Sequence, residues 1–214
     1  MKRVLTSELH EHIDNKVLLQ GWVDNRRDHG KLIFFDLRDR GGYVQTVILP
    51  NHESALETGS SLRPEWVIEV VGKVNKRPDR MINEDQPNGD LEIEAMEIKV
   101  LNQAETPPID PTSDGYDIGE EHRLKYRYLD MRRPRLQRNL RERSKIANYI
   151  RSFLNEKDFV EVETPLLTKS TPEGARDFVV PSRQYPGDFY ALPQSPQQYK
   201  QLLMAGGIER YYQF

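Results

Sequence analysis

The chain contains no cysteine, and this absence excludes several kinds of structure. Without thiols it can form neither a disulfide bond nor a thiolate zinc site. Its five histidines are scattered, and their spacing matches no metal-binding pair, so the sequence predicts no metal site. A protein without disulfides suits a reducing compartment, and we expect a cytoplasmic location.

Long apolar runs are also missing. No segment approaches the ~20 consecutive apolar residues that a membrane-spanning helix needs, so we expect no membrane partner. The charges nearly balance, with 31 basic and 34 acidic residues, which disfavours a protein that binds nucleic acid over its whole surface. Any contact with nucleic acid should therefore be local. A length of 214 residues suits two modest domains.

The first half of the sequence alternates between apolar and polar residues in short runs separated by Gly, Pro, Asn and Asp. These runs predict five strands within residues 17 to 101, and the stretch 52–63 between the third and fourth strands predicts a short helix. Five strands with one helix in this position are typical of a small Greek-key barrel of the oligonucleotide-binding type. We therefore predict such a barrel over residues 1–103.

A change of composition follows the barrel. Residues 102–121 are rich in Pro, Gly and acidic side chains, which predicts a linker or hinge over 104–135 and a second domain over 136–214. From Arg123 to Lys145 ten basic residues are opposed only by Asp130 and Glu142. Two interpretations of this basic segment stay open at this point: it contacts RNA phosphates, or it forms a solvated helix face.

The predicted second strand, Leu-Ile-Phe-Phe-Asp-Leu-Arg-Asp, has an aromatic residue on its polar side. Ile33, Phe35 and Leu37 share one parity and should point inward, which leaves Phe34 outside. An exposed ring on this kind of barrel can stack an unpaired base, although a half-buried aromatic at a barrel edge is an equally good interpretation. Further candidates for contacts with RNA are Arg26, Arg27, His29, Lys31, Gln45 and Glu92.

The second domain begins with an amphipathic pattern that predicts a helix over residues 136–157, followed by a strand that ends at Pro165. Residues 168–177 predict a loop with Glu173 at its centre. Ser195, Pro196 and Gln198 then predict a helix start, with Ser195 as N-cap, and Gly206 predicts its end. Three residues of this helix should be buried: Tyr199, Leu202 and Leu203.

Gln197 and Lys200 lie three residues apart on this predicted helix, near its positive end. An ammonium, an amide and a helix amino terminus together suit an anionic ligand such as a carboxylate. The plainer alternatives are that Lys200 is a solvated helical charge and that Glu173 is a solvated loop carboxylate.

Several of these stretches together resemble the bacterial-type aspartyl-tRNA synthetases, which are class II enzymes. They are residues 21–39 (GWVDNRRDHGKLIFFDLRD), 127–134 (RYLDMRRP), 171–177 (TPEGARD), 193–197 (PQSPQ) and 209–214 (ERYYQF). The resemblance implies a mixed α+β and all-β fold. It comprises a five-stranded OB-fold barrel that binds the anticodon, followed by the truncated start of an antiparallel α/β catalytic domain. The sequence resembles an amino-terminal fragment that ends just before the second class II motif.

The resemblance also implies an activity, aspartate–tRNA ligase, with ATP and Mg²⁺ as cofactors of the complete enzyme. Its partners would be L-aspartate, tRNA(Asp) and a second copy of the chain, with tRNA(Asn) left open. No catalytic residue can be identified, because the arginines of the second and third motifs are absent. The fragment alone should therefore be inactive.

Matching positions imply roles for individual residues. Arg27, Phe34, Gln45 and Glu92 would bind the anticodon, and Pro165 would lie at a dimer interface. Glu173 would bind the ammonium of aspartate and Lys200 its side-chain carboxylate, with Gln197 and Ser195 nearby. Two alternatives remain: a non-catalytic RNA-binding barrel with a vestigial catalytic stub, and a ligase for asparagine or lysine, whose substrates Lys200 would suit poorly.

Overall fold

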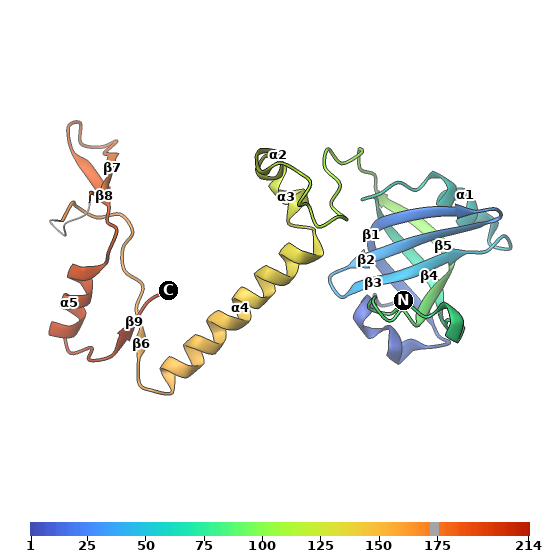
Figure 1. Ribbon diagram of the computed structural model, residues 1–214, viewed down its shortest axis with the longest axis horizontal. Helices are drawn as coiled ribbons and strands as arrows, with labels where there is room; N and C mark the ends of the chain where they lie inside the picture. The colour runs from blue at the N-terminus through green and yellow to red at the C-terminus, as the bar shows by residue number, and fades with distance from the viewer. Residues whose placement is uncertain (172–175) are drawn as a thin grey trace. The chain divides into compact units, whose positions relative to one another are not determined.

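The computed structural model describes residues 1–171 and 176–214 (Figure 1). The chain forms two compact units, Met1–Leu136 and Gln137–Phe214, which we call the first and second units. No helix within the described ranges has the length and apolar character that crossing a membrane would require.

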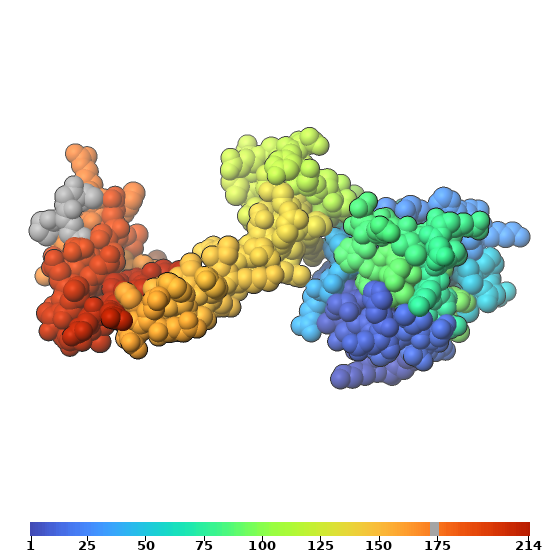
Figure 2. Space-filling view, turned by 60° about the horizontal axis from the view of Figure 1, so that its bottom comes forward, coloured from blue at the N-terminus to red at the C-terminus, as the bar shows by residue number. Residues whose placement is uncertain are grey.

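Five strands of the first unit form a closed barrel in the order β1-β2-β3-β5-β4 (Figure 1). The strands are β1 Lys16–His29, β2 Leu32–Asp39, β3 Gly42–Ile48, β4 Val67–Lys76 and β5 Leu91–Asn102. The helical elements are η1 Thr6–His12, α1 Glu53–Ser61 between β3 and β4, and η2 Asp79–Met81. Figure 2 shows this part of the chain, in blue to green, as a densely filled body. The five predicted strands and the predicted short helix are confirmed.

Alternation along each strand supplies the barrel core. Ile33, Phe35 and Leu37 of β2 point inward, with 6%, 0% and 0% of their surfaces exposed, as their parity predicts. Their neighbours Phe34 and Asp36 lie on the outer face and are half-buried. The inner set also includes Leu9, Val17, Leu19, Val23, Val44, Ile48, Ala55, Leu62, Ile68, Val70, Val74, Leu91, Ile93 and Ala95.

The first strand is longer than its apolar pattern indicates. The alternation ends near Val23, yet β1 continues to His29 and pairs Arg27 with Phe34 of β2. A shift of register between Val23 and Arg26 marks a bulge, which lets a polar stretch remain in the ladder after the inward alternation stops. Arg26, Arg27 and His29 therefore lie within a strand, which the sequence did not predict.

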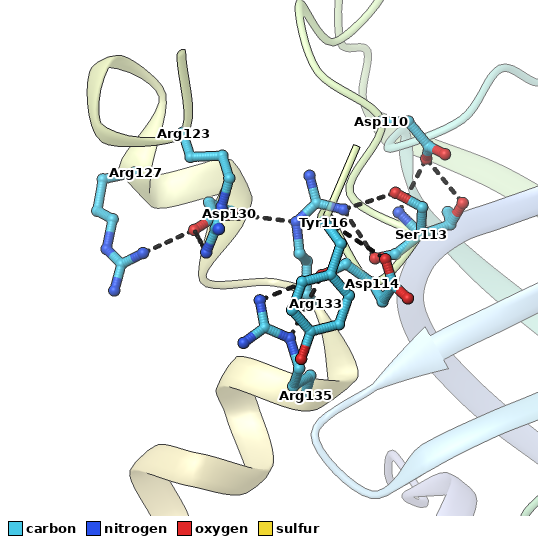
Figure 3. A network of polar contacts seen from close by, with 10 residues as sticks. Asp110, Ser113, Asp114, Tyr116, Arg123, Arg127, Asp130, Arg133 and Arg135 are labelled. Atoms are coloured by element: carbon cyan, nitrogen blue, oxygen red, sulfur yellow. Dashed lines mark hydrogen bonds and ion pairs between the residues drawn. The ribbon is translucent and has the colours of Figure 1, made fainter. Parts of the chain in front are cut away.

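After β5 the chain remains part of the first unit. Two short helices, α2 Glu120–Lys125 and α3 Arg127–Asp130, carry the buried carboxylate of Asp130 (Figure 3). Arg133 Nε donates to Asp130 Oδ1 at 2.7 Å, Arg127 Nη1 donates to Oδ2 at 2.6 Å, and Arg123 Nε donates to Oδ1 at 3.1 Å. One carboxylate thus holds three guanidinium groups.

Arg133 is fully buried and joins this helical segment to the preceding loop. Its Nη1 donates to the backbone oxygen of Ser113 at 2.7 Å and to the Ser113 hydroxyl at 2.9 Å (Figure 3). The guanidinium lies against Gly115, whose φ of +80° is in the left-handed region. A Cβ at Gly115 would lie 2.6 Å from Arg133 Nε, so only glycine leaves room for the arginine.

A second buried carboxylate joins the same segment to the barrel. Glu65 accepts a hydrogen bond from Arg38 Nη2 of β2 at 2.6 Å and another from Arg132 Nη1. Both guanidinium groups also lie over the ring of Trp22. Their Cζ atoms are 5.9 Å (Arg38) and 5.7 Å (Arg132) from the ring centroid. Four arginines of the basic segment, at 123, 127, 132 and 133, are therefore partners of buried carboxylates inside the first unit. The sequence had suggested only contact with RNA phosphates or a solvated helix face for this segment.

The second unit contains little buried apolar surface. Its helices are α4 Pro134–Asn155, whose first residues belong to the first unit, and α5 Gln197–Ala205, and neither contains a fully buried residue. Its strands form two small pairs, β6 Val160–Glu161 with β9 Tyr211–Tyr212, and β7 Phe178–Pro181 with β8 Phe189–Leu192. The strand predicted to reach Pro165 is only two residues long, because parallel pairing with β9 covers only that length.

We expect Asp130→Asn to destabilise the first unit by roughly 3 kcal/mol, because it leaves buried Arg133 without its counter-charge. Both tryptophans, Trp22 and Trp66, lie in this unit, so urea unfolding followed by tryptophan fluorescence measures its free energy of unfolding. Asp90→Asn is the control, since Asp90 pairs with His10 at an exposed site and should cost under ~1 kcal/mol. Equal effects of the two substitutions would contradict the prediction.

The difference in stability between wild type and Asp130→Asn should also depend on pH. Burial alone would raise the pKa of Asp130, but hydrogen bonds from Arg123 and Arg133 outweigh it and hold the pKa below the ordinary value of 3.8. A lowered carboxyl pKa contributes stability above the unfolded pKa, and this contribution is lost as pH falls through the folded value. The stability difference between wild type and Asp130→Asn should therefore be full at neutral pH and shrink below about pH 4.

We also expect slower amide hydrogen exchange in the barrel than in the second unit. The strands β2, β3 and β5 pair on both sides around a buried core, whereas α4 has Ile146 and Tyr149 exposed by 58% and 72%. Hydrogen exchange followed by mass spectrometry checks this. Equal protection in β3 and α4 would show that the second unit is as stable as the barrel.

Candidate functional site

The outer face of the barrel brings the predicted RNA-binding residues together. Arg27 of β1 is the register partner of Phe34 of β2, so their side chains lie side by side on adjacent strands. The His29 ring meets the Phe34 ring edge-on, with 5.6 Å between centroids and 84° between planes. Phe34 is half-buried, which leaves part of its ring accessible for stacking.

The predicted base readers lie on the next two strands. Gln45 of β3 is the register partner of Asp36 on one side and of Glu92 on the other. Glu92 in turn pairs with Asn75 of β4. These four polar residues form a row across the sheet beside the row that contains Phe34, and Gln45 and Glu92 are both half-buried. An aromatic ring, a guanidinium, an amide and a carboxylate thus share one face, a combination that can stack and hydrogen-bond an unpaired base.

Two carboxylates on this face have shifted pKa values. Burial raises the pKa of Asp36, against the opposing influence of Arg27 and Arg77. A hydrogen bond from His52 lowers the pKa of Glu94, whose Oε1 lies 3.0 Å from His52 Nε2. Asp36 has the same parity as Phe34 in β2, and Glu94 has the same parity as Glu92 in β5. The alternation of each strand could therefore have predicted that both carboxylates lie on the outer face. His52 lies outside the strands, and no sequence pattern indicated it.

The predicted carboxylate pocket lies in the second unit. Gln197 is the first residue of α5, and Lys200 lies on the next turn. Lys200 lines a groove with Pro196 and the four residues 211–214, including both residues of β9. The structure thus places a half-buried lysine at a helix amino terminus beside polar groups of a neighbouring strand, which suits an anionic ligand.

Two predictions about this helix are wrong. Ser195 is not the N-cap: Lys200 N donates to Pro196 O at 3.0 Å, so Pro196 caps the helix, without a side-chain hydrogen bond. Leu202 was expected to be buried but is 67% exposed. Tyr199 and Leu203 are half-buried, and Gly206 ends the helix as predicted.

Glu173 lies outside the described residues. On either side of this stretch the chain is held by hydrogen bonds: Ser170 Oγ donates to Asp177 Oδ2 at 2.8 Å, and Gln194 Nε2 donates to Arg176 O at 3.2 Å. Pro165, the predicted interface residue, is exposed just after β6. Within residues 1–171 and 176–214, no group of three or more His, Asp or Glu is placed to hold a metal ion.

Comparison with known families assigns both parts of the chain. Residues 17–101 match the family described as OB-fold nucleic acid binding domain. Residues 119–214 match the family described as tRNA synthetases class II (D, K and N). The order of the two matches agrees with the barrel and the second unit.

Curated relatives match almost the whole chain. An aspartate–tRNA(Asp/Asn) ligase from Halothermothrix orenii is 54% identical over 95% of this chain and 34% of its own length. An aspartate–tRNA ligase from Oceanobacillus iheyensis is 54% identical over 99% of this chain and 36% of its own length. The chain therefore spans about a third of the length of these relatives.

Solved structures show the same fold. A protein described as an aspartyl-tRNA synthetase from Leishmania major Friedlin has a TM-score of 0.86 and 26% identity, over 99% of this chain and 42% of that chain. The asparaginyl-tRNA synthetase from Pyrococcus horikoshii, complexed with asparaginyl-adenylate, has a TM-score of 0.83 and 26% identity, over 100% of this chain and 47% of that chain. Residues 119–214 therefore belong to the class II tRNA synthetases of the aspartate, lysine and asparagine group, and residues 17–101 belong to the OB-fold nucleic acid binding domains.

Proposed function

We propose that this chain carries the anticodon-binding part and much of the aspartate-binding part of an aspartate–tRNA ligase. The complete enzyme would condense aspartate with ATP to aspartyl-adenylate and transfer the acyl group to the terminal adenosine of tRNA. The observation that carries the proposal is the outer barrel face with Arg27, Phe34, Gln45 and Glu92, in a chain 54% identical to aspartate–tRNA ligases. A non-catalytic RNA-binding module is not favoured, since these relatives are ligases and match 95% to 99% of the chain.

On the barrel, Phe34 stacks one anticodon base, and Arg27 beside it contacts the base or its phosphate. Gln45 and Glu92 offer hydrogen-bond donors and acceptors to base edges. The partner is tRNA(Asp). The names of the relatives include both tRNA(Asp/Asn) and unspecified aspartate–tRNA ligases, so tRNA(Asn) is the second candidate.

For the amino acid, Lys200 pairs with the side-chain carboxylate of aspartate, and Gln197 lies near it on the same helix end. Glu173 would pair with the substrate ammonium. Ser195 lies two residues before α5 and contributes to the same region. A cation at position 200 suits aspartate better than asparagine or lysine, which separates this chain from the other members of its group.

No magnesium–ATP site is assigned to the described residues. Among them, no group of three or more His, Asp or Glu is placed to hold a metal ion. Class II synthetases use ATP and Mg²⁺ in general, so we expect the groups that bind them to lie in the two thirds of the relatives' length that this chain does not span.

A homodimer is the proposed assembly of the complete enzyme, with Pro165 near the interface. Exposed apolar side chains on α4, including Ile146, Tyr149 and Phe153, support burial of this helix against another surface. We place the enzyme in the cytoplasm, where tRNA is charged.

Phe34→Ala should weaken binding of an anticodon stem-loop of tRNA(Asp) by about tenfold, because stacking on an aromatic ring contributes ~1–3 kcal/mol per base. The barrel should stay folded, since Phe34 lies outside the core. Filter binding gives the affinity. Phe178→Ala is the control, because Phe178 is 71% exposed and belongs to β7 of the second unit. Unchanged affinity in Phe34→Ala would remove Phe34 from the RNA site.

Lys200→Ala in a complete enzyme that carries this sequence should raise the KM for aspartate about a hundredfold or more, since it removes the counter-charge of the substrate carboxylate. Pyrophosphate exchange measures this step without tRNA. Lys145→Ala is the matched control, because Lys145 is an exposed lysine that pairs with Glu142 on α4. A wild-type KM in Lys200→Ala would count decisively against the carboxylate pocket.

A further inference from the structure

Asp36 stands in an unexpected place, the middle of a face that is proposed to bind a polyanion. It lies between Phe34 and Arg38 along β2 and opposite Gln45 of β3. Its side chain is 20% exposed, so it is neither part of the core nor fully solvated. A carboxylate here repels RNA phosphates, so Asp36 does not attract RNA by its charge.

The nearest cation of this face is Arg27. Its Nη2 donates to Asp36 Oδ2 at 3.4 Å, and its side chain is 47% exposed. An arginine with that much exposure has many rotamers of similar energy, and a fixed anion on one side favours those that keep the guanidinium over the sheet. Arg27 is also the register partner of Phe34, so these rotamers keep the guanidinium on the face of the sheet that carries the aromatic ring.

The neighbouring arginine shows a different arrangement. Arg26 Nε donates to the backbone oxygen of Gly59 in α1 at 3.0 Å, and its Nη2 donates to Asp28 at 2.8 Å. Arg26 is thus engaged by the helix and by its own strand. The two consecutive arginines have separate carboxylate partners, and only the partner of Arg27 lies on the row that contains Gln45 and Glu92.

Asp36 is also costly to keep in this position. Burial disfavours its charged form and raises its pKa, while the charges of Arg27 and Arg77 act in the opposite direction. A serine or asparagine would occupy the same outward site with a smaller desolvation penalty, because neither carries a charge. The benefit of the carboxylate therefore lies in its effect on the arginines around it rather than in the stability of the barrel.

We propose that Asp36 is a positioning residue for recognition of the anticodon: it holds the Arg27 guanidinium beside Phe34 and keeps phosphate groups off this row. The face then accepts an unstacked base and disfavours the backbone of an arbitrary single strand. This inference rests on the proposed anticodon-binding function and adds a source of specificity to it.

The test compares two RNAs: the tRNA(Asp) anticodon stem-loop and the same stem-loop with its three anticodon bases replaced. In the intact 214-residue chain, Asp36→Asn should lower the ratio of the two affinities by about fivefold or more, with affinity for the replaced loop unchanged or increased. A merely structural role would weaken both RNAs equally and leave the ratio unchanged.

Asp28→Asn is the matched control. It removes the same charge from the partner of Arg26 at a site that is 59% exposed, and it should leave the ratio unchanged. In an Arg27→Ala background, Asp36→Asn should change the ratio much less than it does in the wild-type background, because its positioning action passes through Arg27 and only the direct repulsion of phosphates remains. A full effect of Asp36→Asn in that background would overturn the proposed route.

The outcomes separate the two proposals. If the wild-type chain does not distinguish the two RNAs, the anticodon-binding function fails, and the role of Asp36 fails with it. If wild type distinguishes them and Asp36→Asn does so equally well, only the role of Asp36 is overturned. Thermal unfolding of each variant by circular dichroism verifies that the barrel is intact, as an isosteric change outside the core should leave it.

Discussion

Closure of the barrel depends on a short parallel ladder between β3 and β5. It consists of the pairs Gln45 with Glu92, Thr46 with Ile93, and Val47 with Glu94. Without this ladder, β3 and β5 would each present an unpaired edge, and the core between them would be open to water. The same ladder directs Thr46 and Ile93 inward, where both are fully buried, and brings Gln45 and Glu92 together on the outer face. The candidate RNA site and the closed core therefore arise from one contact.

Buried carboxylates organise the rest of the first unit. Asp130 pairs with three arginines of the strongly basic segment, and Glu65 pairs with a fourth. Much of that positive charge is thus used to join residues 104–136 to one another and to the barrel, and less of it is available to RNA. The formal net charge of −3 is still compatible with the proposed RNA-binding face, because that face depends on local residues such as Arg27.

The sequence predicted those features that depend on local alternation and failed on those that depend on distant partners. The outward parity of Phe34 followed from the period-two pattern of its strand, and the structure places Phe34, Gln45 and Glu92 on the outer face. The extension of β1 required the bulge and the partner strand β2. The pair Arg132 with Glu65 joins residues 67 positions apart, and no short-range pattern contains it. At α5, the capping pattern favoured Ser195 as the N-cap, whereas the first backbone hydrogen bond, from Lys200 N to Pro196 O, places the cap at Pro196.

The contact between Gly115 and Arg133 has a consequence for sequence variation. Any β-carbon at position 115 would enter the space that the buried guanidinium fills, and φ of +80° adds strain for every other residue. A replacement at position 115 is therefore compatible with the fold only when position 133 also changes to a shorter side chain, and Asp130 then loses one of its partners. Among natural homologues, positions 115, 130 and 133 should therefore covary, and a substitution at only one of them should be rare.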